Sequence, residues 1–239
     1  MSYNLEQFKD GLKELQIELN EKQISQFLKY YELLVETNKV MNLTAITDPD
    51  QVVDLHMLDS AALLTVDDFS GKKVIDVGTG AGFPGMVLKV LEPTIELTLL
   101  DSLGKRVKWL SELSAQLGAA PVECIHGRAE EQALLEGYRD SYDLAVSRAV
   151  ADLRILAELC LPFVKVGGRF VSYKSGKLNE ELAAAQKAIH VLGGEAKEPV
   201  YFQLTGTEDE RSFVCIEKGK ATPKKYPRKA GTPAKEPIQ

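Results

Sequence analysis

Hydrophobic positions near the start of the chain repeat at helical intervals. Leucine and aromatic side chains recur three or four positions apart between residues 5 and 35, which predicts two amphipathic helices. Asp48 and Pro49 suit the N-cap and first turn of a third helix, which would carry His56. We therefore expect residues 1–66 to form a helical N-terminal unit, or an extension that only covers one end of a following sheet.

From residue 73 onward the pattern changes to short aliphatic runs separated by helix-length segments. This alternation predicts β-α-β units, and the apolar continuity of the runs predicts parallel strands buried on both faces. Two later runs, 200–204 and 212–216, are joined only by a polar loop and should pair antiparallel. The expected fold is α/β and Rossmann-like, with a mostly parallel seven-stranded sheet that ends in an antiparallel hairpin. The five runs expected to be parallel are 73–77, 95–100, 122–125, 143–146 and 169–173.

Composition separates the expected domain, residues 67–218, from the segment that follows it. Residues 219–239 contain four prolines and few aliphatic side chains, which predicts a flexible tail. The whole chain has a net charge of -6, which by itself disfavours a polyanionic partner. However, residues 218–239 hold seven Lys and Arg residues against one Glu, a net charge of +6, so the rest carries −12. The basic end favours electrostatic capture of RNA, with a solvated surface segment as the alternative.

Several classes of protein are excluded by what the sequence lacks. The three cysteines are far apart with no Cys-x-x-Cys pair, so we expect neither a disulfide framework nor a metal site. Charged residues interrupt the first 20 positions, and no segment approaches about 18 apolar residues, so no signal peptide or membrane span is predicted. We expect a cytoplasmic monomer that has no membrane partner.

A glycine-rich loop directly follows the first expected strand. Residues 76–85 read Asp-Val-Gly-Thr-Gly-Ala-Gly-Phe-Pro-Gly, and such a loop lets the backbone approach a cofactor closely. The loop also fits the dinucleotide-binding pattern, because Asp101 lies 19 residues after Gly82, where NAD enzymes carry the acid that binds ribose. The loop alone therefore leaves both NAD and S-adenosylmethionine open.

Three features favour S-adenosylmethionine over NAD. Asp76 places a carboxylate where it could attract the amino group of the cofactor, directly or through water, and would repel a pyrophosphate. The terminal antiparallel pair is the second feature. The third is Ala129 with Glu130, which offer a backbone N–H and a carboxylate to the edge of adenine, although Glu130 could instead only stabilise a helix N-terminus.

Five motifs in order resemble the glucose-inhibited division B family. These proteins are bacterial class I methyltransferases that use S-adenosylmethionine to modify guanine N7 in small-subunit ribosomal RNA. The resemblance spans residues 42 to about 218, and its most specific part is Asp-Ser-Leu-Gly-Lys-Arg at 101–106. The motifs are Asn42-Leu43-Thr44, His56-x-x-Asp59-Ser60, residues 76–85, residues 100–106 and Ser147-Arg148-Ala149.

The resemblance implies a set of site residues and a ribosomal RNA or small-subunit partner. Asp101 and Arg148 end expected strands, and ligands of open parallel sheets gather at the carboxyl ends of the strands. Candidate RNA contacts are His56, Arg128, Lys174 and Arg211. The expected cofactor contacts are Gly78, Gly80, Phe83, Asp101, Ser102, Leu103, Ala129, Glu130 and Arg148.

The residues after the fourth expected strand narrow the acceptor. Ser147-Arg148-Ala149 stands where methyltransferases of exocyclic amines carry Asn/Asp-Pro-Pro-Tyr/Phe, and no cysteine follows a proline as in pyrimidine C5 methyltransferases. Guanine N7 has its own lone pair and needs no general base. Arg148 and Arg128 could donate to guanine O6, although Arg148 could instead form a structural ion pair.

His56 and Asp59 should share one helix face, where we expect them to border the RNA or brace the glycine loop. Neither is expected to act as a general base. The alternatives that remain open are a small-molecule methyltransferase, an NAD-dependent oxidoreductase and a non-catalytic regulatory protein that binds a nucleotide cofactor.

Overall fold

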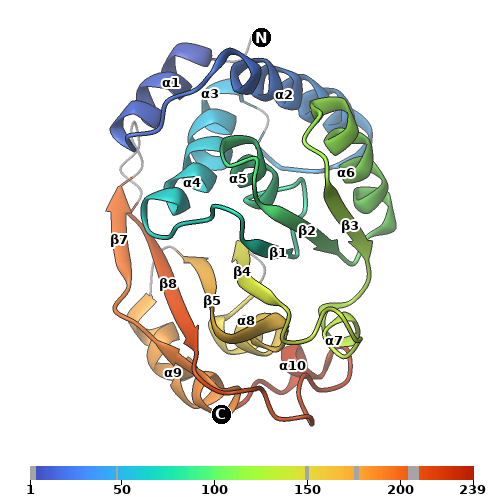
Figure 1. Cartoon of the computed structure of the whole chain (residues 1–239), viewed down its shortest axis with the longest axis vertical. Helices are drawn as coiled ribbons and strands as arrows, with labels where there is room; N and C mark the ends of the chain where they lie inside the picture. The colour runs from blue at the N-terminus through green and yellow to red at the C-terminus, as the bar shows by residue number, and fades with distance from the viewer. Residues whose placement is uncertain (1–3, 47, 149–150, 175–177, 204–209) are drawn as a thin grey trace.

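The computed structural model describes residues 4–46, 48–148, 151–174, 178–203 and 210–239 (Figure 1). Within these residues an eight-stranded sheet has the order β3-β2-β1-β4-β5-β8-β6, and β7 also pairs with β8. Strands β1 to β5 are parallel, and β8 is antiparallel to β5, as the sequence predicts. The strands are β1 (Lys73–Val77), β2 (Glu96–Asp101), β3 (Val122–His126), β4 (Tyr142–Arg148), β5 (Val164–Lys174), β6 (Gly194–Ala196), β7 (Val200–Gln203) and β8 (Glu210–Lys218).

The antiparallel edge of the sheet has one more strand than expected. Both β6 and β7 pair antiparallel with β8, at opposite ends of that strand. Pro199 lies between them and cannot donate an N–H to the β8 ladder, which accounts for the interruption. Leu204, the expected end of the strand at 200–204, lies outside the described residues.

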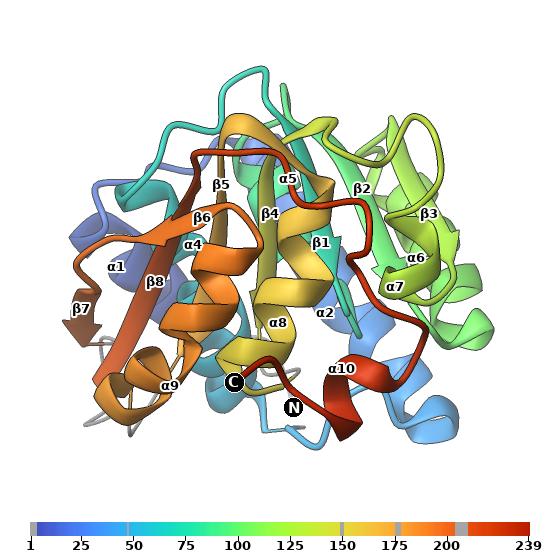
Figure 2. The same cartoon turned by 90° about the horizontal axis from the view of Figure 1, so that it is seen from below.

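Helices cover both faces of the sheet (Figures 1 and 2). One hydrophobic cluster joins the sheet to the N-terminal helices and to α5 and α6, while a second cluster joins the other face to α8 and α9. The small helix α7 follows β3, and α10 lies in the C-terminal segment. These helices are α5 (Gly85–Leu91), α6 (Gly104–Leu117), α7 (Ala129–Gln132), α8 (Leu153–Cys160), α9 (Leu178–Val191) and α10 (Thr232–Lys235).

The N-terminal helices share the core of the sheet instead of forming a separate body. Their bounds are α1 (Leu5–Glu14), α2 (Glu21–Met41) and α3 (Pro49–Val52), and Asp48 caps α3 as expected. Two buried amides of α2 cap other helices: Gln23 donates to the carbonyls of Val90 and Leu91 at the end of α5, and Gln26 donates to that of Leu117. The predicted covering extension therefore describes this region better than an independent unit.

The C-terminal residues differ most from the sequence prediction. Residues 219–239, the C-terminal strap, run along the face that carries α8 and α9 (Figure 2). Arg228 forms an ion pair with the fully buried Glu158, and the buried Thr222 donates to the carbonyl of Leu192. Ion pairs and backbone bonds thus replace the aliphatic contacts that the composition lacks, so this segment is not the flexible tail that its composition predicts.

Candidate active site

A cleft of about 1080 Å³ opens where β1, β2 and β4 end. Its position agrees with the rule that ligands bind beyond the carboxyl ends of parallel strands. Ten of the thirteen residues given as cofactor or RNA contacts line this cleft, namely His56, Gly78, Gly80, Phe83, Asp101, Ser102, Leu103, Arg148, Lys174 and Arg211. The other three, Arg128, Ala129 and Glu130, are absent from the lining formed by the described residues.

The glycine loop is supported by α2 on one side and borders open space on the other. Gly80 has a φ of +60°, and a Cβ there would meet nothing within 4 Å. Gly82 has a φ of +90°, and a Cβ there would lie 2.7 Å from the Tyr30 hydroxyl. That hydroxyl donates to the carbonyl of Ala81 at 2.6 Å. Helix α2 therefore supports the loop, and the space beside Gly80 is left for a ligand.

Asp76 supports the same loop from the end of β1. The carboxylate is fully buried, and its Oδ2 accepts from the Thr79 hydroxyl at 2.7 Å and from the Gly85 N–H at 2.8 Å. Its Oδ1 has no hydrogen-bond partner among the described residues. Burial raises the pKa of Asp76 to about 6. Because the side chain lies beneath the cleft lining, a water-mediated contact with a cofactor fits better than a direct one.

Asp101 joins the loops that follow β1 and β2. Its Oδ2 accepts from the Gly80 N–H at 3.0 Å, and its Oδ1 accepts from the Leu103 N–H at 2.9 Å. The Arg106 guanidinium lies 3.7 Å from Oδ2. Each carboxylate oxygen can accept more than one hydrogen bond, so Asp101 can still bind hydroxyl groups from the cleft.

These residues fit the adenosine end of S-adenosylmethionine. Asp101 offers acceptors to the ribose hydroxyls, and Gly80 offers open space for a close backbone approach. Leu103 is 51% exposed and gives the same end of the cleft an apolar surface for a base. The chemistry of this donor and acceptor set therefore suits a ribose with an attached base.

Arg148 ends β4 and is clamped by the segment after α3. Its Nη1 donates to Asp59 Oδ2 at 2.7 Å and to the Leu55 carbonyl at 3.1 Å. Its Nη2 lies 3.2 Å from His56 Nδ1. The Arg211 guanidinium lies 3.6 Å from the other oxygen of Asp59. The structural ion pair that the sequence left as an alternative is thus present, and it lies in the wall of the cleft.

The local helix geometry explains how this clamp forms. A π-helix, Val53–Leu58, follows α3 and leads into α4 (Asp59–Ala61). The Leu55 carbonyl that accepts from Arg148 belongs to this π turn, and such turns frequently occur at functional sites. His56 and Asp59 lie on the same side, as their spacing predicts, because both contact Arg148.

His56 braces the glycine loop as a neutral side chain. Its ring stacks on that of Phe83 with centroids 4.6 Å apart, and Phe83 stacks on Tyr30 at 5.2 Å. The Nδ1 atom faces a guanidinium that can only donate, so it must accept, which leaves the proton on Nε2 for the Thr44 hydroxyl at 2.8 Å. Burial and the positive charge of Arg148 lower the pKa of His56 to about 3.

This low pKa predicts how turnover depends on pH. Protonation of His56 requires the pH to fall toward 3, so the side chain stays neutral between about pH 5 and 8. We expect His56 to contribute no step to turnover near 6.5, the ordinary histidine value, so any step in that region, such as one from Asp76, should persist in His56→Asn. A step in that region that disappears in His56→Asn would show that the histidine titrates during catalysis.

The far side of the cleft combines basic and aromatic side chains. Lys174 pairs with Glu181 and donates to the Ala151 carbonyl at 2.9 Å. Phe202 lines the cleft beside Arg211 and stacks on Phe213 with centroids 4.6 Å apart. This half offers cationic groups and an aromatic ring to a nucleotide. Ala149, which belongs to the motif at the end of β4, lies outside the described residues.

The start of α7 lies beside the cofactor half of the cleft without lining it. Asp101 and His126 are register partners, so β3 ends next to β2 and α7 follows close by. Glu130 Oε1 accepts from the Gly231 N–H at 2.8 Å and from the Arg128 guanidinium at 3.2 Å. Burial acts to raise the pKa of Glu130, but these hydrogen bonds outweigh it and lower the pKa.

Some lining or supporting residues gave no recognisable signal in the sequence. Tyr30, Phe202 and Glu181 reach the site from α2, β7 and α9. Their roles depend on contacts between distant parts of the chain, which no local pattern records.

In the described part of the chain, no group of three His, Cys, Asp or Glu residues could hold a metal ion. Over the same residues, no helix is both long and apolar enough to cross a membrane.

The strand order, the glycine loop and the acid at the end of β2 together define a class I methyltransferase fold. Solved structures agree at the level of the fold. A methyltransferase from Pyrococcus furiosus matches with a TM-score of 0.55 and 14% identity, over 79% of this chain and 96% of that one. A SAM-dependent methyltransferase from Aquifex aeolicus matches with a TM-score of 0.53 and 16% identity, over 73% and 96%.

Sequence comparison identifies the family. The profile of rRNA small subunit methyltransferase G matches residues 23–212. The ribosomal RNA small subunit methyltransferase G of Alkaliphilus metalliredigens is 50% identical over 232 residues, 97% of each chain. The one from Lachnoclostridium phytofermentans is 48% identical over 232 residues, covering 97% of this chain and 96% of that one. The chain belongs to the rRNA small subunit methyltransferase G family, which confirms the resemblance found in its motifs.

The protein is therefore an enzyme that uses S-adenosylmethionine, as the sequence predicts. Family membership does not favour the oxidoreductase, the small-molecule methyltransferase or the non-catalytic regulatory protein.

Proposed function

We propose that this protein transfers a methyl group from S-adenosylmethionine to N7 of a guanine in small-subunit ribosomal RNA. The observation that carries the proposal is the similarity to relatives named ribosomal RNA small subunit methyltransferase G over nearly the whole chain. The cleft supports this acceptor, because its adenosine-binding half adjoins a half with cationic and aromatic side chains. Arg148 lines the same cleft as the residues of both halves.

The charge state of the cleft suits an acceptor that loses no proton. When bound, S-adenosylmethionine supplies an electrophilic methyl group on a positively charged sulfur. Guanine N7 can accept this group with its own lone pair, so the reaction does not require a side chain that removes a proton. His56 is neutral and both of its ring nitrogens have partners. The carboxylates of Asp101 and Glu181 are held by hydrogen bonds or ion pairs.

Catalysis then depends on alignment of the reacting atoms. Arg148 uses three of its five N–H groups on Asp59, Leu55 and His56, which leaves two for the O6 of guanine. The same contacts fix the guanidinium in the cleft wall. The acceptor nitrogen can thereby be held in line with the methyl group, an orientation effect that can account for much of the rate.

A change of one acceptor atom tests the proposal. Small-subunit ribosomal RNA transcribed with 7-deazaguanosine has a carbon in place of N7 and therefore no lone pair there. We expect methyl transfer to fall by at least about 100-fold, since about 2.7 kcal/mol or more of barrier would be added. A transcript with 7-deazaadenosine is the matched control and should be methylated normally. Equal labelling of both substituted transcripts would refute N7 as the acceptor.

We also propose that the enzyme acts as a monomer in the cytoplasm, where its RNA substrate is located. The apolar side chains of the N-terminal helices support the monomer, because Phe8 and Phe27 are buried in the core of their own chain. Sedimentation equilibrium should give a mass near 26.3 kDa, and a concentration-independent mass of twice that value would contradict the monomer.

A further inference from the structure

We propose that the C-terminal strap positions Glu130 at the adenine edge of the cofactor site and thereby sets the affinity for S-adenosylmethionine. This inference rests on the proposed function, in which the start of α7 contacts the cofactor. It gives residues 219–239 a role in cofactor binding, where the charge of the sequence suggested RNA capture.

The first attachment of the strap is an ion pair with α8. Arg228 Nη2 lies 2.7 Å from Glu158 Oε2, while its Nε and its backbone N–H donate to Oε1 at 2.9 and 2.8 Å. The Glu158 side chain is only 1% exposed. A buried carboxylate with several charge-assisted bonds holds its partner firmly, since breaking the pair would leave a charge without compensation.

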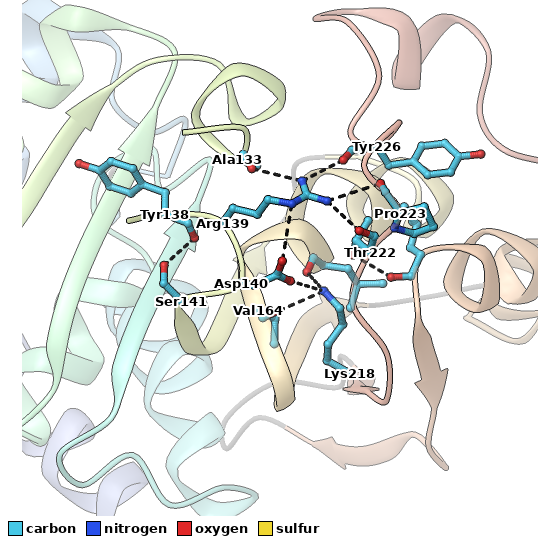
Figure 3. A network of polar contacts seen from close by, with 12 residues as sticks. Ala133, Tyr138, Arg139, Asp140, Ser141, Val164, Lys218, Thr222, Pro223 and Tyr226 are labelled. Atoms are coloured by element: carbon cyan, nitrogen blue, oxygen red, sulfur yellow. Dashed lines mark hydrogen bonds and ion pairs between the residues drawn. The ribbon is translucent and has the colours of Figure 1, made fainter. Parts of the chain in front are cut away.

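The second attachment lies where the segment after α7 ends (Figure 3). Arg139 donates to the strap carbonyls of Thr222 at 2.8 Å and Tyr226 at 2.9 Å. Beside it, the buried Lys218 ammonium donates to the carbonyls of Leu161 and Val164 at 2.6 and 3.0 Å. The beginning of the strap is therefore fixed to the body of the protein at several points.

The third attachment reaches Glu130 itself. The Gly231 N–H donates to Glu130 Oε1 at 2.8 Å, and the Arg128 guanidinium donates to the same oxygen at 3.2 Å. Gly231 has a φ of +82°, a conformation that favours glycine. The backbone N–H of Glu130 also bonds to this carboxylate, and because each carboxylate oxygen can accept more than one hydrogen bond, the side chain can still accept one from the exocyclic amine of adenine.

The segment between β3 and β4 needs this external support. Its helix, α7, has four residues, and the backbone hydrogen bonds around it, such as those from the Ala133 N–H to the Ala129 carbonyl and from the Arg139 N–H to the Leu135 carbonyl, run within the segment and do not attach it to the other elements. Leu134 and Leu135 are 55% and 51% exposed, so the apolar side chains buried in the core there are the small ones of Ala129 and Ala133. The strap contacts this segment at Glu130 and at Arg139, and its removal would take away the contacts at both places.

A pair of glycine variants tests the contact with Glu130. In Gly231→Ala the added methyl group meets nothing within 4 Å, so the chain should fold, but the strain at positive φ displaces the N–H. Gly167→Ala is the matched control, because Gly167 has a φ of +87° and equally open space but lies in β5. Calorimetry with S-adenosylhomocysteine should show a dissociation constant raised about fivefold in Gly231→Ala and unchanged in Gly167→Ala.

A second pair tests the anchor of the strap. Arg228→Ala should raise the dissociation constant of S-adenosylhomocysteine about tenfold, whereas Lys224→Ala removes the same charge from an exposed position and should have no effect. Gly231→Ala and Arg228→Ala should also discriminate less between bases. The analogue of S-adenosylhomocysteine that carries hypoxanthine in place of adenine should bind these two variants with a smaller loss of affinity, relative to S-adenosylhomocysteine, than it shows with the unchanged protein. That loss of discrimination would not follow from a merely structural role, because it reports the carboxylate at the base edge.

The outcomes separate this inference from the proposed function. If Arg228→Ala does not fold, the glycine pair alone decides. Unchanged affinity and unchanged base discrimination in Gly231→Ala would overturn the inference, as would equal losses in Gly231→Ala and Gly167→Ala. Because binding of S-adenosylhomocysteine requires no RNA, such a result would leave N7 methylation standing. Failure of the wild-type protein to bind S-adenosylhomocysteine would instead contradict the proposed function.

Discussion

Replacement of Arg148 by alanine is expected to lower the free energy of unfolding by about 3 kcal/mol, because it removes one partner of a buried ion pair. The Asp59 side chain is only 7% exposed, and its 2.7 Å bond to Arg148 would be lost. Arg211, at 3.6 Å, would compensate only in part. The Leu55 carbonyl and His56 Nδ1 would also lose their donor, and the π-helix would no longer be fixed to β4.

The same substitution should reduce methyl transfer by about 100-fold or more, since a small misalignment in an active site is enough for such a loss. Urea unfolding and single-turnover transfer of a labelled methyl group would measure the two effects. Arg154→Ala is the control for stability, because Arg154 and Asp152 form a pair that is 28% and 34% exposed and should contribute less than about 1 kcal/mol. Full turnover with unchanged RNA affinity in Arg148→Ala would contradict the role given to Arg148.

The second large effect is expected for Gly82→Ala in the glycine loop. The added methyl group would lie 2.7 Å from the Tyr30 hydroxyl and 3.2 Å from Leu110, at a φ of +90°. Overpacking together with backbone strain should lower the free energy of unfolding by about 2 to 3 kcal/mol. The loop would also have to move away from Tyr30, which should weaken cofactor binding by more than about 30-fold.

Gly71→Ala provides the control for this variant. Gly71 has a φ of +64°, and a Cβ there would meet nothing within 4 Å. It should lose about 1 kcal/mol of stability through strain alone and bind the cofactor normally. Calorimetry with S-adenosylhomocysteine and thermal unfolding would compare the two. Similar cofactor affinities in both variants would show that the packing of Tyr30 under the loop does not position it.

The sequence predicts the parallel strands and most of the residues that line the cleft, for a physical reason. Short aliphatic runs such as β1 (Lys73–Val77) are buried on both faces, so their pattern is continuous and easily recognised. In a parallel sheet the residues that directly follow such strands must meet at one edge. Asp101 and Arg148 could therefore be placed from their positions at strand ends alone.

The contacts that hold Arg148 and the course of the C-terminal strap could not be predicted in the same way. The π-helix arises from a local departure from the helical repeat, and the repeat is the only signal that the sequence offers there. Arg228 and Glu158 are 70 residues apart in the chain, and composition cannot indicate that a basic, proline-rich segment will neutralise a buried carboxylate. Tertiary ion pairs, unlike strands, leave no periodic pattern.

The most direct test of the function is nucleoside analysis of RNA methylated by the purified protein. Small ribosomal subunits and their naked RNA, prepared from cells that lack the protein, would be incubated with labelled S-adenosylmethionine and digested to nucleosides. We predict that the label appears in 7-methylguanosine, in the subunit or in the naked RNA. Label in a different nucleoside, or no label in either preparation, would contradict methylation of guanine N7 by this enzyme.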